Sequence, residues 1–262
     1  GYGRLFDLSN MNNVVEIIGV SKSFGSHVVL DNVSLKVEVG ENMVVFGQSG
    51  TGKSVLLKCI VRLLEPDSGE IFIEGTDVLK LQIKELNEIR KQLGFLFQGA
   101  ALYDSMSVKE NLEFPLIRHF NFTPKEREEK VKSVLEKVSL EEAINKMPSE
   151  LSGGMKKRIG LARSIIAEPK LMLYDEPTTG LDPITSKEIS SLILELQKSL
   201  KMTSIVVTHD LLCAEIIADR AIVLNEGAVQ HSGTITELTT SRDPFLRNFF
   251  SHEIIEEQNR RI

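Results

Sequence analysis

GQSGTGKS, residues 47–54, is the stretch that decides the fold, because its pattern is typical of a loop that holds phosphate. The apolar run MVVF (43–46) precedes it, and the apolar run LLKCI (56–60) follows it. The pattern G-x-x-x-x-G-K-[ST] gains its meaning from this context of strand, loop and helix. A glycine-rich turn without a ligand is the plainer alternative, and the complete pattern between both flanks argues against it.

The residue types of this loop suit a phosphate chain. Gly47, Gly50 and Gly52 let the backbone curl around an anion without Cβ clashes. Successive N–H groups then point inward at a helix N-terminus, where the helix dipole also favours negative charge. Lys53 can reach the outer phosphates, and the Ser54 hydroxyl can ligate Mg²⁺.

Polar residues end three other apolar runs. Asp175 and Glu176 end LMLYDE, Gln98 ends LGFLFQ, and His209 ends SIVVTH. Ligand sites of open parallel sheets lie beyond the carboxyl ends of the strands, so we expect these side chains near the loop. Asp175 would support a Mg²⁺ ion, and Glu176 could orient or deprotonate an attacking water. The plainer alternatives are a capped turn for the two acids and a structural role for a lone histidine, and Gln98 alone proves nothing.

The order of the apolar runs predicts an α/β fold. β-branched runs between residues 14 and 39, broken by Gly25 and Asp31-Asn32, indicate antiparallel strands. From residue 43 onward strands alternate with helices, which indicates a mainly parallel sheet covered on both faces. Between about residues 99 and 167 helical spacing replaces the strand runs, which indicates a helical insertion.

Three helices are predicted from local signals. Thr123, Pro124 and Glu126 have the pattern of a capped helix start. A second helix is expected to reach Leu64 from the phosphate loop, and a third to begin after Asp182. The first and third carry apolar residues at helical spacing, namely Val131, Val134, Leu135 and Val138, and Ile189, Leu192, Ile193 and Leu196.

Composition narrows the class of protein. The 262 residues carry a net charge of −6, which argues against a nucleic-acid partner because such proteins have a basic footprint. The two cysteines, Cys59 and Cys213, form no CxxC pair. No apolar run is long enough to span a bilayer. Residues 1–10 are expected to be a leader or a cloning remnant, and the tail from Ser241 an amphipathic helix that packs on its own domain or on a partner.

Taken together, GQSGTGKS, Gln98, LSGGM (151–155), LMLYDE, Asp182 and His209 resemble, in order and spacing, the nucleotide-binding subunits of ATP-binding-cassette (ABC) transporters. Other phosphate-loop ATPases lack LSGGM. The resemblance implies an α/β fold with a P-loop NTPase (RecA-like) core, an N-terminal antiparallel β-subdomain and an inserted α-helical subdomain. The implied ranges are 11–98 and 168–240 for the core, 99–167 for the insertion and 241–262 for a C-terminal helical tail.

The resemblance also implies roles for the matching residues. Phe24 would stack on adenine in place of the more usual tyrosine, and Asp182 would couple the two sites of a dimer. Glu176 would be the catalytic carboxylate, and His209 would contact the γ-phosphate. Gln98 would sense Mg²⁺ and link to the membrane subunit, with Ser54 and Asp175 as the other metal residues. The phosphates of ATP would be held by Gly47, Gln48, Ser49, Gly50, Thr51, Gly52, Lys53 and Ser54.

The stretch LSGGMKKR (151–158) is a second candidate for holding phosphate, because two glycines precede three cationic residues. The resemblance implies that Ser152, Gly153 and Gly154 cap the γ-phosphate of ATP bound by the other copy of the chain. Two chains would then form a homodimer that sandwiches two nucleotides head to tail.

The segment GFLFQGAALYDSMSVKENLEFPL (94–116) is similar to the ATPases of MCE-type (Mla-like) phospholipid transport systems, and Met155 and Tyr174 fit that branch. This implies permease subunits and an MCE-domain lipid-binding protein as partners, and a peripheral position on the cytoplasmic face of the inner membrane. The alternatives are the ATPase of another importer, for example of polar amino acids, and a soluble ATPase of iron–sulfur assembly. Glu176 and His209 argue against a module that binds without hydrolysing.

Overall fold

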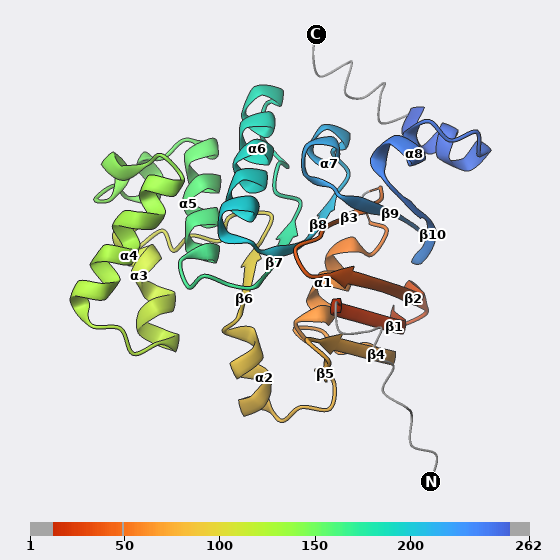
Figure 1. Cartoon of the computed structure of the whole chain (residues 1–262), viewed down its shortest axis with the longest axis horizontal. Coiled ribbons are helices and arrows are strands. Elements are labelled where there is room, and N and C mark those ends of the chain that lie inside the picture. The colour runs from red at the N-terminus through yellow and green to blue at the C-terminus, as the bar shows by residue number, and fades with distance from the viewer. Residues whose placement is uncertain (1–12, 49, 252–262) are drawn as a thin grey trace.

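The computed structural model describes residues 13–48 and 50–251 and contains two sheets, which lie side by side in Figure 1. The expected leader, Ser49 and the end of the tail lie outside the described residues. The first sheet has the order β2-β1-β4-β5 and is antiparallel. Its strands are β1 (Asn13–Phe24), β2 (His27–Glu38), β4 (Ser68–Ile73) and β5 (Thr76–Asp77).

The break expected at Asp31-Asn32 is wrong, because β2 continues through both residues. The pairing of β1 with β2 shifts here: Val20 pairs with Val33, and Lys22 with Leu30. Asn32 has a φ of 51°, and its N–H donates to the Ser21 hydroxyl at 2.9 Å. The polar pair therefore forms a bulge, a position that asparagine tolerates well.

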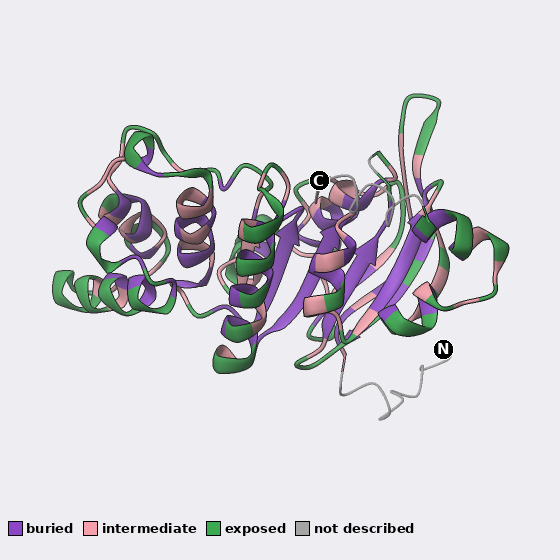
Figure 2. Cartoon of the chain, turned by 90° about the horizontal axis from the view of Figure 1, so that it is seen from above, coloured by how far each residue is buried: buried purple, intermediate pink, exposed green. Residues whose placement is uncertain are grey.

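The second sheet has the order β10-β9-β3-β8-β7-β6 and forms the core of the fold. All its neighbouring strands run parallel except β10, which pairs antiparallel with β9 at one edge. Every residue of β3, β7 and β8 is buried, as expected for strands covered on both faces, and Figure 2 shows the strands as a buried layer. The strands are β3 (Asn42–Phe46), β6 (Leu93–Leu96), β7 (Leu171–Asp175), β8 (Thr203–Thr208), β9 (Arg220–Asn225) and β10 (Ala228–Gly233).

Five helices accompany the sheets: α1 (Lys53–Ile60), α2 (Ile83–Arg90), α6 (Pro183–Leu200), α7 (Leu211–Ile217) and α8 (Ile235–Thr239). The third expected helix is confirmed as α6, with its four apolar residues buried. Helix α1 ends before the expected Leu64, because Arg62 is left-handed at a φ of 53° and the N–H groups of Leu63 and Leu64 both donate to the Lys58 carbonyl. Sequence reasoning missed α2, in which only Leu86 is buried.

Three further helices, α3 (Val108–His119), α4 (Pro124–Lys137) and α5 (Gly153–Ile165), lie together beside β6 at one end of the molecule (Figure 1). The short 3₁₀ turns Glu141–Ala143 and Pro148–Glu150 connect α4 to α5. The capped start of α4 is confirmed: the Thr123 hydroxyl accepts from the Glu126 N–H, and the Glu126 carboxylate accepts from the Thr123 N–H at 2.7 Å. The four apolar residues predicted for its buried face are all buried.

The C-terminal tail packs on its own chain, which was one of the two expected arrangements. Residues 244–251 are helical, and Leu246, Phe249 and Phe250 are buried. The rings of Phe249 and Phe250 lie 5.7 and 5.4 Å from the ring of Phe46, the last residue of β3. Within the described residues, none of the helices has the length and apolar character to cross a membrane.

Candidate functional site

The carboxyl ends of four parallel strands meet at one edge of the core sheet. The registers pair Phe46 of β3 with Thr208 of β8, and Asp175 of β7 with Val207 of β8. The phosphate loop, Glu176 and His209 directly follow these strand ends, and Gln98 follows β6 by two residues. The residues predicted at the strand ends therefore converge on this edge, where α/β sheets bind their ligands.

Two glycines of the loop, Gly47 and Gly52, are required by close backbone contacts. A Cβ on Gly47 would lie 2.6 Å from the Leu224 carbonyl oxygen. A Cβ on Gly52 would lie 2.6 Å from the Val29 carbonyl oxygen, and Gly52 also has a φ of +93° at the start of α1. The loop is therefore fixed between β2 and β9, with its glycines at the N-terminus of α1.

Lys53 lies along the inside of the loop. Its buried ammonium group donates to the carbonyl oxygens of Gly47 at 2.5 Å and Gln48 at 2.8 Å. The same nitrogen lies 3.4 Å from a carboxylate oxygen of Glu176. The cation is thus positioned between the loop and the catalytic candidate.

Ser54 and Asp175, two of the three predicted metal residues, are in contact. The Ser54 hydroxyl donates to the Asp175 carboxylate at 2.6 Å. Hydroxyl and carboxylate oxygens are the hard ligands that Mg²⁺ prefers, so this pair fits a magnesium ion. Gln98 is exposed at the same edge, and its backbone carbonyl oxygen, not its side chain, accepts a hydrogen bond from Lys157.

Glu176 is buried and surrounded by partners. One carboxylate oxygen accepts from His209 Nδ1 at 2.9 Å and from the Thr179 hydroxyl at 3.4 Å. A carboxylate only accepts, so Nδ1 carries the proton in this contact. Burial raises the pKa of Glu176, but the hydrogen bond from His209 and the charges of His209 and Lys53 outweigh it and hold this pKa below its usual value. An ionised carboxylate at this position can orient a water molecule or accept its proton.

Asp182 and Ser152 each cap a helix. The Asp182 carboxylate accepts from the N–H groups of Ile184 and Thr185 at 3.0 Å, and hydrogen bonds from Thr185 lower its pKa. Ser152 accepts from the Met155 N–H at 3.2 Å, and it is exposed together with Gly153. These contacts account for both residues as caps, and their roles toward a nucleotide stay predictions.

The glycines of the second candidate stretch bring α5 close to α6. A Cβ on Gly154 would lie 2.9 Å from a methyl carbon of Thr185. Two of the three cationic side chains that follow are bound inside the chain. Lys157 is buried and donates to the Gln98 carbonyl, and Arg158 donates to the Val138 carbonyl and to Glu188. The cationic pattern therefore does not by itself form a phosphate site.

Phe24 is the last residue of β1, directly before the turn to β2, and 49% of its surface is exposed. The Lys22 ammonium group lies 5.5 Å from the centre of its ring. An exposed aromatic ring is free to stack on a base, and this role also stays a prediction.

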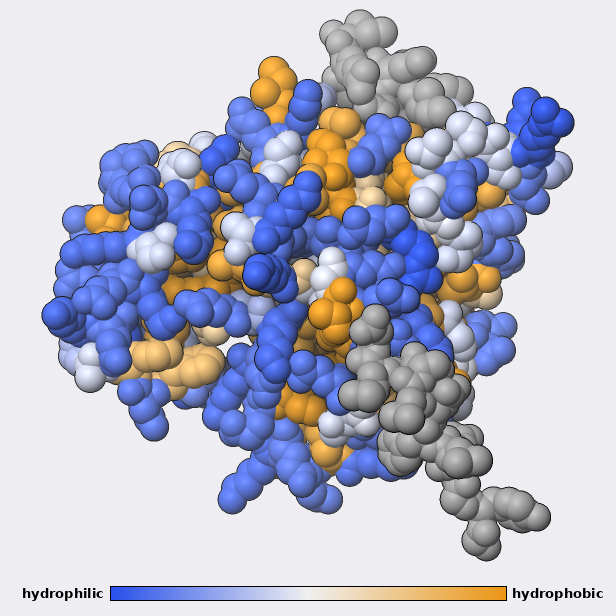
Figure 3. All heavy atoms as spheres, viewed as in Figure 1, coloured by the Kyte–Doolittle hydropathy of each residue, from blue (hydrophilic) through white to orange (hydrophobic). Residues whose placement is uncertain are grey.

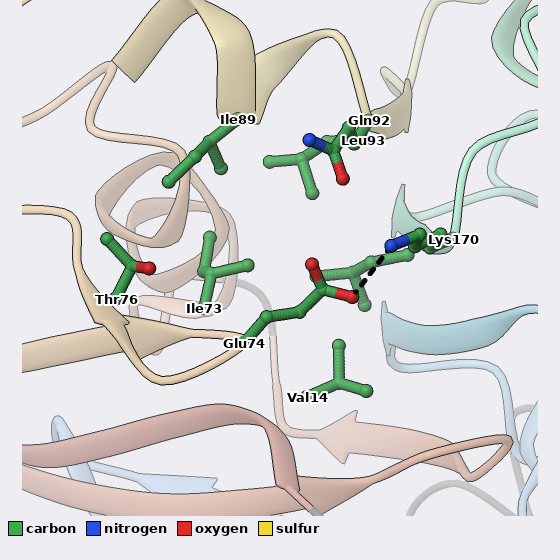
Figure 4. Close-up of a pocket in the computed structure, with 9 residues that line it drawn as sticks. Val14, Ile73, Glu74, Thr76, Ile89, Gln92, Leu93 and Lys170 are labelled. Atoms are coloured by element: carbon green, nitrogen blue, oxygen red, sulfur yellow. Dashed lines mark hydrogen bonds and ion pairs between the residues drawn. The ribbon is translucent and has the colours of Figure 1, made fainter. Parts of the chain in front are cut away.

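Among the hollows of the described residues, two that lie away from the phosphate loop bear on the function. The first, about 170 Å³, is lined by Val14, Ile73, Leu93 and Leu171 and crossed by an ion pair of Glu74 and Lys170 at 3.3 Å (Figure 4). Leu93 and Leu171 begin β6 and β7, so this hollow lies at the opposite end of the strands from the site.

The second hollow, about 320 Å³, lies between β6 and the helical insertion. Aromatic and cationic side chains line it, among them Phe95, Phe97, Tyr103, Phe114, Phe120, Arg90, Lys91 and Arg163. Figure 3 shows hydrophobic side chains at the surface beside α3 on an otherwise mostly hydrophilic face. Phe97, which lines this second hollow, is the residue before Gln98.

Sequence reasoning missed three contributors around the site. Thr179 contacts Glu176, and Lys157 and Arg163 hold the segment after β6 by its carbonyl oxygens. No signal pointed to these roles, because a threonine in a loop and cations on a helix are ordinary surface residues in a sequence.

Comparisons with known proteins agree with this geometry. The family model described as "ABC transporter" matches residues 30–179. A "Probable ribonucleotide transport ATP-binding protein mkl" of Mycobacterium leprae is 39% identical over 241 residues, covering 92% of this chain and 70% of that protein. The "Intermembrane phospholipid transport system ATP-binding protein MlaF" of Haemophilus influenzae is 40% identical over 241 residues, covering 92% of this chain and 91% of that protein.

Among solved structures, a dimeric ATP-binding cassette in a post-hydrolysis state with ADP and Pi superposes with a TM-score of 0.77. It is 33% identical, and the match covers 84% of this chain and 98% of that one. The predicted fold, an α/β core with an antiparallel sheet and a helical insertion, is thereby confirmed.

Proposed function

Because the chain belongs to the ABC transporter family and is an ATP-hydrolysing subunit, we propose that it powers the movement of phospholipids or related lipids at a bacterial membrane. ATP hydrolysis is supported mainly by one observation: Glu176 contacts His209 and Lys53 beyond the carboxyl ends of the parallel strands. The lipid part is supported by the segment 94–116 and by likeness to MlaF over most of both chains.

In this proposal the loop 47–54 holds the phosphates of ATP with its N–H groups, the start of α1 and Lys53. Ser54, Asp175 and Gln98 would hold Mg²⁺, which would screen the charge of the phosphates. Glu176 orients the attacking water and accepts its proton. His209 fixes the Glu176 carboxylate by a hydrogen bond at 2.9 Å and contacts the γ-phosphate. Phe24 stacks on the adenine.

The complete site would contain a second copy of the chain. The exposed tip of α5, with Ser152, Gly153 and Gly154, presents free N–H groups and the positive end of a helix dipole. In the homodimer this tip would cap the γ-phosphate of ATP bound by the partner, and Asp182 would lie between the two sites. The dimeric form of the related cassette with ADP and Pi supports this arrangement.

The hollow between β6 and the helical insertion is a suitable docking place for a permease helix. Its aromatic wall and cationic rim lie next to Gln98, so a docked helix would be adjacent to the nucleotide site. In the proposed complex the chain is peripheral on the cytoplasmic face of the inner membrane, and an MCE-domain protein carries the lipid.

A second candidate function is the import of a polar solute. The name of the M. leprae relative specifies ribonucleotide transport, and that protein is 39% identical to this chain. A soluble ATPase of iron–sulfur assembly is disfavoured because the M. leprae and H. influenzae relatives, which each match 92% of this chain, carry the names of transport proteins.

The test is reconstitution of the chain with its permease in vesicles that carry a labelled phospholipid. We expect ATP to drive transfer of the label to acceptor vesicles, and the complex with Glu176→Gln to bind ATP without transfer. ATP-driven uptake of a polar solute, with no movement of lipid, would instead support the second candidate.

A further inference from the structure

One face of α5 holds the short segment that follows β6. Lys157, Gly160 and Arg163 are spaced three residues apart, so they line one side of the helix. All three contact residues 98–101: Lys157 donates to the Gln98 carbonyl, and Arg163 donates to the Ala101 carbonyl at 2.7 Å. We call residues 98–101 with this face of α5 the clamp.

The middle of the clamp is a close backbone contact. A Cβ on Gly160 would lie 2.9 Å from the Ala100 Cβ and 3.2 Å from its Cα, so only glycine lets the segment rest on the helix. Ala100 and Ala101 have φ values of 58° and 50°, a left-handed conformation that costs energy for alanine. Such a conformation persists when surrounding contacts hold it, and here these contacts come from α5.

Lys157 is the buried member of the clamp, with 6% of its surface exposed. Burial lowers the pKa of its ammonium group, and the charges of Asp175 and Glu176 partly offset this. A buried cation is costly unless it is hydrogen-bonded, so the contact with the Gln98 carbonyl is energetically significant. The lysine thus lies close enough to Asp175, the predicted metal residue, and Glu176, the predicted catalytic residue, to interact with their charges.

We propose that Lys157 is a positioning residue that fastens Gln98 to α5, so that Gln98 and the Ser152 tip move as one body. The inference rests on the proposed function, in which Gln98 belongs to one nucleotide site and Ser152 to the other. Lys157 lies five residues beyond Ser152 on the same helix, about 7.5 Å along its axis. A displacement of Gln98 by the ligand of one site is therefore passed directly to the cap of the second site.

The test compares Lys157→Met with Lys157→Arg, which keeps a long cationic donor, and with the control Lys132→Met, an exposed lysine of α4. Hydrogen exchange measures the clamp itself. In Lys157→Met we expect amides of residues 98–103, including the Ala100 N–H, to exchange about tenfold faster, because a hydrogen bond from a charged donor is lost. Lys157→Arg should restore much of the protection, and Lys132→Met should match the parent.

Measurements of ATP binding and of ATP hydrolysis distinguish an effect on the coupling of the two nucleotide sites from an effect on nucleotide binding. ATP affinity of the isolated Lys157→Met chain should be unchanged, while the Mg²⁺ concentration for half-maximal hydrolysis rises and cooperativity in ATP falls. Unchanged exchange and unchanged cooperativity in a folded Lys157→Met chain would overturn the clamp proposal. If the parent chain itself neither dimerises with ATP nor hydrolyses it, the proposed function fails instead, whatever the variants do.

Discussion

At the scale of single residues, Glu176 has a tightly constrained environment. It is buried, its φ is 49°, and it shares its carboxylate between His209, Lys53 and Thr179. A non-glycine residue in the left-handed region is uncommon, and such strain is typical of functional positions. The carboxylate is therefore held in one place by its backbone as well as by its partners.

Replacing Glu176 by glutamine should stop hydrolysis while leaving ATP bound. The amide keeps the shape of the side chain but accepts no proton, and loss of one positioned catalytic base commonly costs a factor of about 10² or more. In the presence of ATP and Mg²⁺ this variant should accumulate as a dimer, which size-exclusion chromatography would detect.

The double variant Glu176→Gln, Ser152→Arg is the control for that experiment. It should still bind ATP, because the proposed homodimer places Ser152 in the partner's site, but it should remain monomeric. A dimer of the same stability with arginine at position 152 would contradict the composite site, and parental hydrolysis by Glu176→Gln would contradict the role of the carboxylate.

At the scale of elements, local signals predicted what depends on neighbours in sequence. The cap at Thr123 and the buried face of α4 followed from residues within one or two turns. Helix α2 was missed because its single buried residue, Leu86, gives no periodic pattern, and its cap is the unusual Gln82. The clamp could not be predicted, because it joins carbonyl oxygens near residue 100 to side chains about sixty residues later.

The cap of α4 gives a stability prediction. Thr123→Ala should lower the free energy of unfolding by about 1 kcal/mol, the usual cost of losing such a cap, with hydrolysis unchanged. Urea unfolding checks the change, and Ser133→Ala, exposed within the same helix, should have an effect of at most a few tenths of a kcal/mol.

The loss of unfolding free energy caused by Thr123→Ala should depend on pH. Hydrogen bonds from the Thr123 N–H and hydroxyl hold the pKa of Glu126 below its usual value in the folded chain. A lowered folded pKa stabilises the fold above the unfolded pKa, about 4.3 for glutamate, and this contribution is lost as the pH falls through the lowered value. A penalty for Thr123→Ala that grows on acidification would contradict the capping box.

At the scale of the whole molecule, the alternation of strands and helices predicted the core sheet, and the loss of strand runs predicted the helical insertion. The order of strands and the place of the tail depend on contacts across the chain, so the sequence left the tail with two possible partners. The structure shows the tail on Phe46, directly before the phosphate loop. The C-terminal helix thus supports the strand that carries the loop.

Alanine variants of two phenylalanines should affect different properties, one the stability of the fold and the other the binding of ATP. Phe250→Ala should cost about 3–5 kcal/mol in unfolding free energy, because its buried ring leaves a cavity against Phe46. Phe24→Ala should leave stability within about 0.5 kcal/mol but weaken ATP binding about tenfold through lost base stacking. Urea unfolding and titration with a fluorescent ATP analogue measure the two effects, and an equal loss of stability in both variants would contradict the assignment.

In the proposed homodimer a chain lends Ser152 to its neighbour and not to itself, so the exposed tip of α5 also has a genetic consequence. In a cell that makes both an intact and a Ser152→Arg polypeptide, a mixed pair would put the damaged tip against the nucleotide of the healthy product. The defective allele would therefore interfere with the normal one, and the phenotype would be dominant rather than proportional to gene dosage.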